Sequence, residues 1–410
     1  MSPSSAPASS LVLALVLAGL AILGPFSVDT YLPAFPAIAA SLNTSALHVQ
    51  QTLSIYMFAF ATMMLWHGAL SDAFGRRNII LASLAVFAVA SLGCASAHSV
   101  EYLWAFRALQ GISAGAGIVI GRAIIRDLHA GAEAEKLLAL VTMIFSIGPA
   151  VAPIIGGFIV KFFSWRMIFL FLFAYTLLLI WVCWKKLPES LPPEKRQPFN
   201  PGFLWESYSL IFRSPAFHLK AGTVATNFAG LFLFVASAPV VVTQHLGLGP
   251  DQFGWLFVPA VSGIFLGSLT ANRMAGKLPI ERQARIGFAL MLSAGLANTL
   301  YHSLAAPALP WSVLPLFFYT AGMSIVMPGV TLMVLDLFPH IRGIVASCQS
   351  FTMTMLGSVV AGVLSPLLSH SMAGLAAGQL VFSLLGFTLW KASKRLRARQ
   401  ALASSNPSAP

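Results

Sequence analysis

A single acidic residue, Asp29, stands alone in a long apolar stretch near the start of the chain. It falls in the segment PFSVDTYLP, and no other Lys, Arg, Asp or Glu precedes Asp72. A second isolated charge, Arg107, lies in the apolar segment YLWAFRALQGISAGAG. A charge at the centre of a membrane helix costs about 2.5–3.5 kcal/mol on insertion scales, so such residues face a protein interior or a wet cavity. There a carboxylate can bind and release a proton, and a nearby guanidinium can tune that exchange.

Each of these two charges also has a purely structural interpretation. Asp29 could be a helix-end residue that extends to the membrane surface, and Arg107 could be held by backbone carbonyls. In the functional interpretation, Asp29 exchanges a proton between two conformations and Arg107 is its partner. Proton binding would then be linked reciprocally to the binding of a second ligand.

The composition defines the class of protein that must position these residues. The chain has 410 residues, of which 58% are hydrophobic and 9% are charged, whereas soluble domains are about 25% charged. An all-α integral membrane protein is therefore predicted. The three cysteines and nine histidines show no metal-ligand spacing, and no nucleotide-binding Gly-x-x-x-x-Gly-Lys-Ser/Thr sequence is present. We expect no metal, no cofactor beyond a proton gradient, and no enzymatic activity.

Twelve apolar segments of about membrane-spanning length follow one another along the chain. In the first half they cover 10–32, 50–70, 79–97, 102–124, 137–160 and 166–184. In the second half they cover 219–242, 253–272, 284–304, 311–334, 343–367 and 371–391.

The spacing of these segments predicts two six-helix, pseudo-symmetric halves around a central cavity, over residues 1–184 and 219–391. A Pro-rich, charged linker at 185–218 joins them, with a short amphipathic helix expected at GFLWESYSLIF. A basic, disordered cytoplasmic tail is expected at 392–410. The loops GALSDAFGRR and GSLTANRMAGK, after the second and eighth spans, are a weak internal repeat, and repeated halves are typical of transporters.

The basic residues orient the predicted spans. With both termini in the cytoplasm, all of the 24 Lys and Arg residues fall on the cytoplasmic side except Arg107, Lys161 and Arg166. This is the positive-inside pattern. The formal net charge of +12 is then explained by contact with anionic lipid and requires no nucleic-acid partner. We expect a monomer in a bacterial inner membrane.

The loop after the second predicted span reads GALSDAFGRRNIIL. It resembles the signature loop of the major facilitator superfamily, although Ala73 stands where the pattern usually has Arg. The resemblance implies that the loop stabilises one conformation of a transporter, while a solvated turn with anchoring bases is the structural alternative. The residues assigned to this motif are Gly68, Asp72, Gly75, Arg76 and Arg77.

Two further motifs strengthen the resemblance. Arg107, Gln110 and Gly111 resemble the superfamily's Arg-x-x-Gln-Gly motif, which is tied to proton coupling. The segment SIGPAVAPIIGGFIV resembles the antiporter motif, which marks exporters, although Ala152 replaces one Gly. Its matching residues are Gly148, Pro149, Pro153, Gly156 and Gly157.

The segments VDTYLPAFPAIAASL and RAIIRDLHAG resemble one branch, the Bcr/CflA drug-resistance transporters. This resemblance implies drug/proton antiport that exports small, mostly neutral or lipophilic antibiotics such as chloramphenicol- or bicyclomycin-like compounds. A proton-coupled exporter of a sugar or amino-acid derivative is the alternative. Six residues are candidates for the substrate cavity, although an aromatic or Met residue taken alone is more often core or lipid-facing: Tyr31, Tyr56, Met57, Phe60, Gln110 and Asn227.

Overall fold

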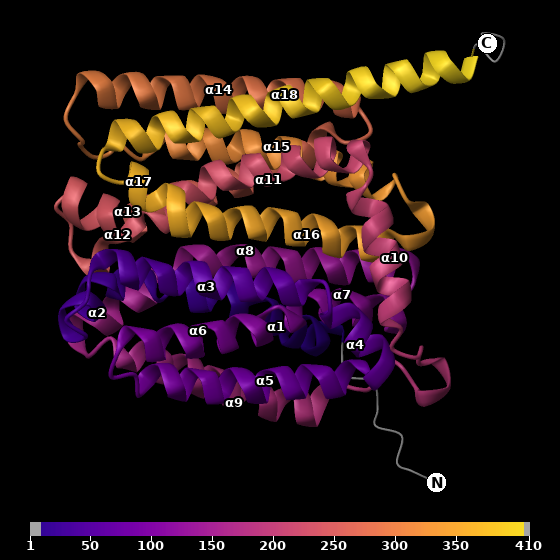
Figure 1. Ribbon diagram of the computed structural model, residues 1–410, viewed down its shortest axis with the longest axis horizontal. Coiled ribbons are helices and arrows are strands. Elements are labelled where there is room, and N and C mark those ends of the chain that lie inside the picture. Colours follow the sequence, from indigo (N-terminus) through magenta and orange to yellow (C-terminus); the bar gives the residue numbers. More distant parts are fainter. Residues whose placement is uncertain (1–9, 406–410) are drawn as a thin grey trace.

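The computed structural model describes residues 10–405 and shows a bundle of helices (Figure 1). The first part of the chain forms α1 (Ser10–Asp29), α2 (Phe35–Ser41), α3 (Ala46–Met64), α4 (His67–Phe74), α5 (Arg76–Ala95), α6 (Val100–Ala114), α7 (Ala116–Leu128), α8 (Gly131–Phe162) and α9 (Arg166–Lys186). The remainder forms α10 (Pro201–Phe212), α11 (Pro215–Ala236), α12 (Ala238–Val240), α13 (Gly254–Met274), α14 (Ile280–Leu304), α15 (Leu314–Leu335), α16 (Arg342–Val359), α17 (Ser365–Leu368) and α18 (Met372–Ser405). Three short turns matter below: η1 (Leu32–Ala34), η4 (Pro250–Gln252) and the π-helical η6 (Val360–Leu364).

Polar caps define where several of these helices begin. The side chains of Ser45, Ser99, Asn200 and Ser214 each accept a hydrogen bond from the backbone N–H three residues later. Such caps satisfy donors that the first helical turn leaves unpaired. Between the caps the sequence is almost wholly apolar, and a helix is the element that satisfies its own backbone groups in lipid.

Ten helical segments are long and apolar enough to cross a membrane, and α3 with α4, bent by 48°, would make an eleventh. The remaining predicted span, 284–304, forms α14, which does not meet this criterion. At 25 residues it is about 37 Å long, and it packs against α15 and α18. The structure therefore shows an all-helical membrane protein, and the count of twelve depends on α14 crossing as well.

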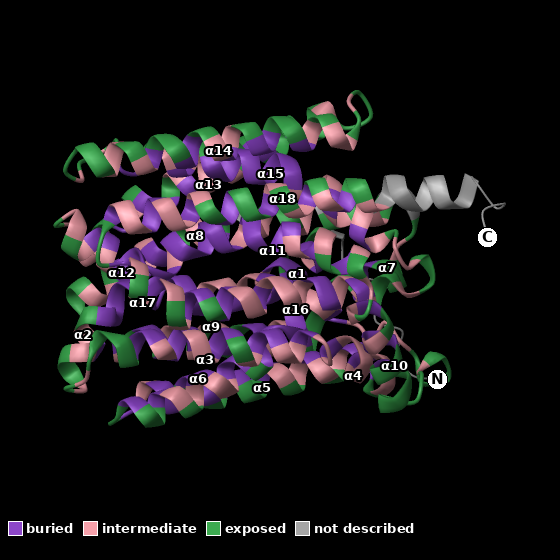
Figure 2. Ribbon diagram, turned by 45° about the horizontal axis from the view of Figure 1, so that its top comes forward, coloured by how far each residue is buried: buried purple, intermediate pink, exposed green. Residues whose placement is uncertain are grey.

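In Figure 1, α1–α9 lie together on one side of the bundle and most later helices lie on the other. Contacts between α3 and α16 and between α8 and α13 join the two groups. We call the end that carries α4 and α10 the linker end, and the end that carries α2, α12 and α17 the opposite end. Buried residues line the interior and exposed ones face outward (Figure 2). The domain boundaries themselves stay a prediction.

Two expectations about the linker and tail can be compared with the helices. The amphipathic helix expected in the linker is confirmed as α10. The disordered tail expected at 392–410 is wrong as far as residue 405, because α18 continues to Ser405. The segment KASKRLRARQALA is rich in Ala, Lys, Arg and Leu, which all favour helix. Residues 406–410 lie outside the described part of the chain.

Candidate functional site

Arg107 is fully buried on α6, at the centre of a polar and aromatic cluster. Its Nη1 donates to the carbonyl of Ser27, at 3.2 Å, and to Oε1 of Gln110, at 2.8 Å. The guanidinium carbon lies 4.7 Å from the ring centroid of Tyr31 and 4.2 Å from that of Tyr56. A desolvated cation over one aromatic ring gains about 2 kcal/mol, so the two rings offset much of the cost of burying the charge.

Neighbouring hydrogen bonds fix the orientation of this cluster. Gln110 Nε2 donates to the hydroxyl of Ser91, at 2.9 Å, so the amide presents its oxygen to Arg107. The hydroxyl groups of Tyr31 and Thr52 lie 2.8 Å apart, which holds the Tyr31 ring in place. Nε and Nη2 of Arg107 have no hydrogen-bond partner in the described part of the chain. The guanidinium is therefore held in a fixed position while two of its nitrogen donors stay unpaired there.

Asp29 is the last residue of α1 and is 6% exposed. Among the described residues, none forms an ion pair or a hydrogen bond with its carboxylate. The contact of Arg107 with α1 is made to the Ser27 carbonyl instead. The expected Asp29–Arg107 partnership is therefore not a direct contact in this conformation. Burying an unpaired carboxylate costs far more than burying its neutral acid.

The six candidate cavity residues are all buried, none more than 8% exposed. Tyr31, Tyr56 and Gln110 surround Arg107, and Phe60 stacks on Tyr56. The other two lie elsewhere: Met57 of α3 contacts α16, and the side-chain amide of Asn227 in α11 has no hydrogen-bond partner among the residues described. None of the six lines the cavity described next, so their contact with a substrate stays a prediction.

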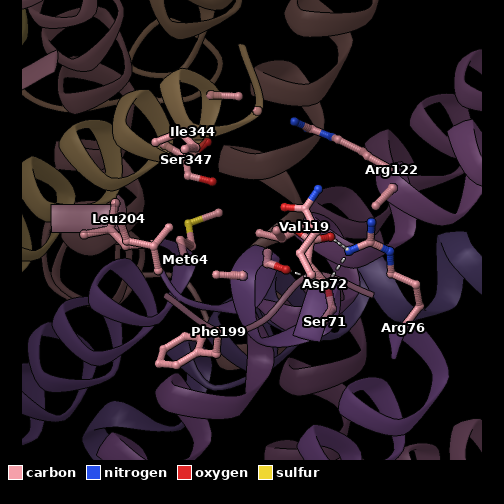
Figure 3. A pocket seen from close by; sticks show the side chains of 18 of the residues that line it. Met64, Ser71, Asp72, Arg76, Val119, Arg122, Phe199, Leu204, Ile344 and Ser347 are labelled. Atoms are coloured by element: carbon pink, nitrogen blue, oxygen red, sulfur yellow. Dashed lines mark hydrogen bonds and ion pairs between the residues drawn. The ribbon is translucent and has the colours of Figure 1, made fainter. Parts of the chain in front are cut away.

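A cavity of about 360 Å³ lies at the linker end, between α3, α4, α7, the linker and α16 (Figure 3). Its wall combines apolar side chains with arginines from α7. Sequence reasoning placed these arginines on the cytoplasmic side but did not assign them to a cavity. One feature of the sequence could have indicated a position facing a cavity: Arg122 falls inside the predicted span 102–124, fifteen positions after Arg107. The labelled wall residues are Met64, Ser71, Asp72, Arg76, Val119, Arg122, Phe199, Leu204, Ile344 and Ser347.

The signature-loop residues form the edge of this cavity. Arg76 makes an ion pair with Asp72, four residues earlier, and its Nε lies 3.1 Å from Oδ2 of Asp127 on α7. Its Nη1 also donates to the Ser71 hydroxyl, at 2.7 Å. Arg76 therefore ties α4 to α7 and holds both acids. Gly68 and Arg77 lie beside this network, and Arg77 donates to the carbonyl of Trp184, at 2.6 Å.

The start of α5 is capped by a residue from the linker that sequence reasoning missed. The Glu189 carboxylate accepts hydrogen bonds from the backbone N–H of Arg76, at 3.0 Å, and of Arg77, at 3.2 Å. Gly75 precedes them with φ +95°, a conformation that glycine adopts without strain. A Cβ there would also lie 2.6 Å from Glu189 Oε2. The cap is remote in sequence, so no local pattern reveals it.

Glu189→Gln is expected to lower the free energy of unfolding by about 1 kcal/mol. The amide offers one acceptor oxygen in place of two and removes a negative charge from a helix N-terminus. The thermal unfolding midpoint of the purified protein measures this change. Glu194→Gln is the matched control, because Glu194 is exposed in the same linker. Equal losses in both variants would contradict the capping role.

The glycines of the predicted antiporter motif pack α8 against its neighbours. Gly148 faces Ile22 of α1. An added Cβ at Gly156 would collide with the carbonyl of Thr30, and one at Gly157 with the carbonyl of Pro250 in η4. Pro149 and Pro153 lie inside α8, which stays one helix of 32 residues. The motif therefore lets α8 contact both α1 and the later half of the chain.

Side chains of α3 close the opposite end against the later half. Gln50 Nε2 donates to the carbonyls of Ala236, at 3.0 Å, and Ala361, at 3.1 Å. Gln51 Nε2 donates to the Gly362 carbonyl, at 2.8 Å. Hydroxyl groups on Ser54 and Ser358 each donate to the other residue's carbonyl, at 2.9 Å. We call these contacts the α3 seam.

Gly157→Ala is expected to destabilise the packing of α8 against η4 by about 1–3 kcal/mol, the usual cost of overpacking. The new methyl would meet the η4 backbone. The thermal unfolding midpoint again provides the measurement. Gly121→Ala serves as the control, since its nearest atom would be Leu17 Cδ2 at an ordinary 3.8 Å. An unchanged midpoint for Gly157→Ala would show that η4 is not held by this contact.

Helices of membrane-spanning length, with a cavity at one end and a closed seam at the other, are the architecture of a transporter. The sequence matches the family model described as Major Facilitator Superfamily over residues 17–362. The chain therefore belongs to the major facilitator superfamily, whose members are transporters and not enzymes. Multi-pass membrane location follows from the same finding.

Several curated bacterial proteins are similar to this chain. The uncharacterized MFS-type transporter YdgK of Bacillus subtilis is 33% identical over 355 residues, covering 85% of this chain and 87% of that protein. The bicyclomycin resistance protein homolog of Haemophilus influenzae is 30% identical, covering 87% and 90%. Multidrug resistance protein D of Escherichia coli is 27% identical, covering 93% and 94%. The solved proton:xylose symporter XylE shares the fold, with a TM-score of 0.72 at 16% identity over 93% of this chain and 95% of that one.

Proposed function

We propose that this chain is a proton-coupled multidrug efflux transporter of the Bcr/CflA type, which exports small, mostly neutral or lipophilic antibiotics. The observation that carries the proposal is Asp29, a buried carboxylate without an ionic partner among the described residues. Relatives named for bicyclomycin resistance and multidrug resistance support the drug class. The antiporter-like glycines on α8 support export.

Alternating access gives Asp29 its role in this proposal. The turn η1, which begins three residues after Asp29, packs against α8, η4 and α12 near the closed end. Separation of these elements would expose Asp29 to water at the opposite end, where it could take up a proton. When the protein returns to the present conformation, Asp29 would no longer be open to the opposite end, and its proton would be carried inward with it. Drug and proton would then favour different conformations, and their binding would be linked reciprocally.

The linker end faces the cytoplasm in this proposal, with both termini on that side of a bacterial inner membrane. The basic residues of the linker and of α18 would then lie beside anionic lipid. One chain contains both groups of helices that must move, so the protein is proposed to act as a monomer.

Proton release from energised inverted vesicles that contain the protein tests this function. A pH-sensitive dye reports release on addition of antibiotics such as chloramphenicol and bicyclomycin, or of sugars and amino-acid derivatives. Release by antibiotics supports the drug exporter. Release by a metabolite alone would replace it with the metabolite exporter, and no release with either panel would contradict proton coupling.

A further inference from the structure

Two arginines of α7 face the linker-end cavity without a counter-ion. Arg122 and Arg126 both line it and both side chains are exposed. Within residues 10–405, no described side chain forms an ion pair or hydrogen bond with either. Asp72 lines the same cavity and Asp127 follows Arg126 in the sequence, but both of these acids pair with Arg76 instead. Like charges four residues apart destabilise a helix, so this pair lacks an anion.

The rest of the cavity wall includes both apolar and polar side chains. Phe199, Phe203 and Leu204 from the linker region and Met64 from α3 present apolar surface. Polar groups line the same space, and in Figure 3 Arg122 and Ser347 project toward it from different helices. The polar wall residues are Gln197, Asn200, Ser347 and Ser350. Such a wall fits a compound with one aromatic or aliphatic body and one polar end.

Arg122 also borders a second cavity of about 130 Å³ between α1, α7 and α8. This smaller space is lined mainly by apolar side chains, including Leu17, Leu138 and Phe145. Arg122 therefore stands where the two spaces meet. A ligand whose anionic group binds at Arg122 can therefore place its apolar part in either of the two cavities.

We propose that Arg122 and Arg126 bind the negatively charged group of amphipathic organic anions, such as aromatic carboxylates or sulfonates, at the linker-end cavity. This inference rests on the proposed function and adds amphipathic compounds with an anionic end to its mostly neutral substrates. Arg forms paired, charge-assisted hydrogen bonds with carboxylate and similar oxyanions. A neutral analogue of the same shape forgoes that charge assistance, and a cation is repelled. The negatively charged headgroup of a membrane lipid offers the same chemistry.

Equilibrium binding of two probes of equal shape tests the proposal. Purified full-length protein in nanodiscs of phosphatidylcholine is titrated with 2-naphthoate and with 2-naphthamide. We expect naphthoate to bind at least roughly tenfold more tightly, a difference of about 1.4 kcal/mol, and this preference to fall as salt rises. Arg122→Gln and Arg126→Gln should each reduce the preference, and the double variant should remove it.

Arg285→Gln is the matched control, because Arg285 is exposed on α14 and does not line the cavity. Its preference for naphthoate should equal that of the unchanged protein. Equal affinities of the two probes for the unchanged protein would overturn the proposal. A preference that survives in the double variant would overturn it as well.

Nanodiscs that also contain phosphatidylglycerol distinguish the two sources of the anion. Naphthoate affinity that stays high there identifies a small organic anion as the occupant. Affinity that falls in these nanodiscs, but not in the Arg122→Gln, Arg126→Gln double variant, shows the lipid headgroup occupying the arginine pair, and overturns the assignment to a substrate. Because binding needs no proton gradient, Asp29→Asn should keep the naphthoate preference, so failure of proton coupling and failure of this site are separable.

Discussion

Asp29→Asn is expected to abolish proton release driven by drug addition in inverted vesicles. Asparagine matches the carboxylate in shape but cannot exchange a proton at any physiological pH. Since no described residue pairs with the Asp29 side chain, the substitution removes no ionic contact that holds the fold. Drug binding should persist while drug-dependent proton movement falls to background. Dye dequenching and equilibrium drug binding, measured on the same preparation, separate the two effects.

Asp336→Asn is the control for this experiment. Asp336 is exposed and pairs with Arg342 at 2.8 Å, so the variant makes the same chemical change away from the interior. It should retain drug-driven proton release at the level of the unchanged protein. Normal release in Asp29→Asn, at equal amounts in the membrane, would remove Asp29 from the coupling mechanism.

Arg107→Lys is expected to reduce transport by at least roughly tenfold although it keeps the positive charge. The planar guanidinium lies against the Tyr31 and Tyr56 rings while it donates to Ser27 and Gln110. An ammonium group is a compact point charge and cannot reproduce both stacked contacts together with these hydrogen bonds. The loss of one desolvated cation–π contact should also cost about 2 kcal/mol of stability. Initial rates of drug-driven proton release and the thermal unfolding midpoint measure the two effects.

Arg213→Lys provides the comparison, because Arg213 is an exposed residue that follows α10. It should leave both the transport rate and the midpoint unchanged. Full transport by Arg107→Lys would show that a positive charge alone suffices at this position. A lower midpoint with full transport would assign Arg107 to folding only.

The sequence was sufficient to predict the helical membrane architecture, because the lengths of apolar runs and the placement of Lys and Arg are local properties. It also predicted that Arg107 faces either the bundle interior or a wet cavity, since lipid excludes an unpaired charge, and the structure shows it buried. The helix of the linker was predictable for a similar reason, because the amphipathic segment GFLWESYSLIF follows an Asn that caps it.

The partners of these residues were not predictable, because they come from distant parts of the chain. Nothing near Arg107 in sequence indicates that Tyr31 and Tyr56 lie against its guanidinium. The cap that Glu189 provides for α5 joins residues more than a hundred positions apart. The sequence suggested that Arg107 tunes Asp29 but left their distance open, and in this conformation the two side chains make no direct contact among the described residues. The contact of Arg107 with α1 is made to the backbone carbonyl of Ser27, and residue type alone does not predict a contact to the backbone.

The α3 seam has a consequence for how this protein can change over generations. Most of its acceptors are main-chain carbonyls, on Ala236, Ser358, Ala361 and Gly362. A carbonyl persists whatever side chain its residue carries, so substitutions at several of these positions leave the acceptor in place. Two positions are exceptions, because an added Cβ at Gly362 would meet Ser54 and the Ser358 hydroxyl itself donates to the Ser54 carbonyl. The acceptors of the α3 seam can therefore persist while side chains of the later half change over generations, so its closure depends mainly on the donor side chains of α3.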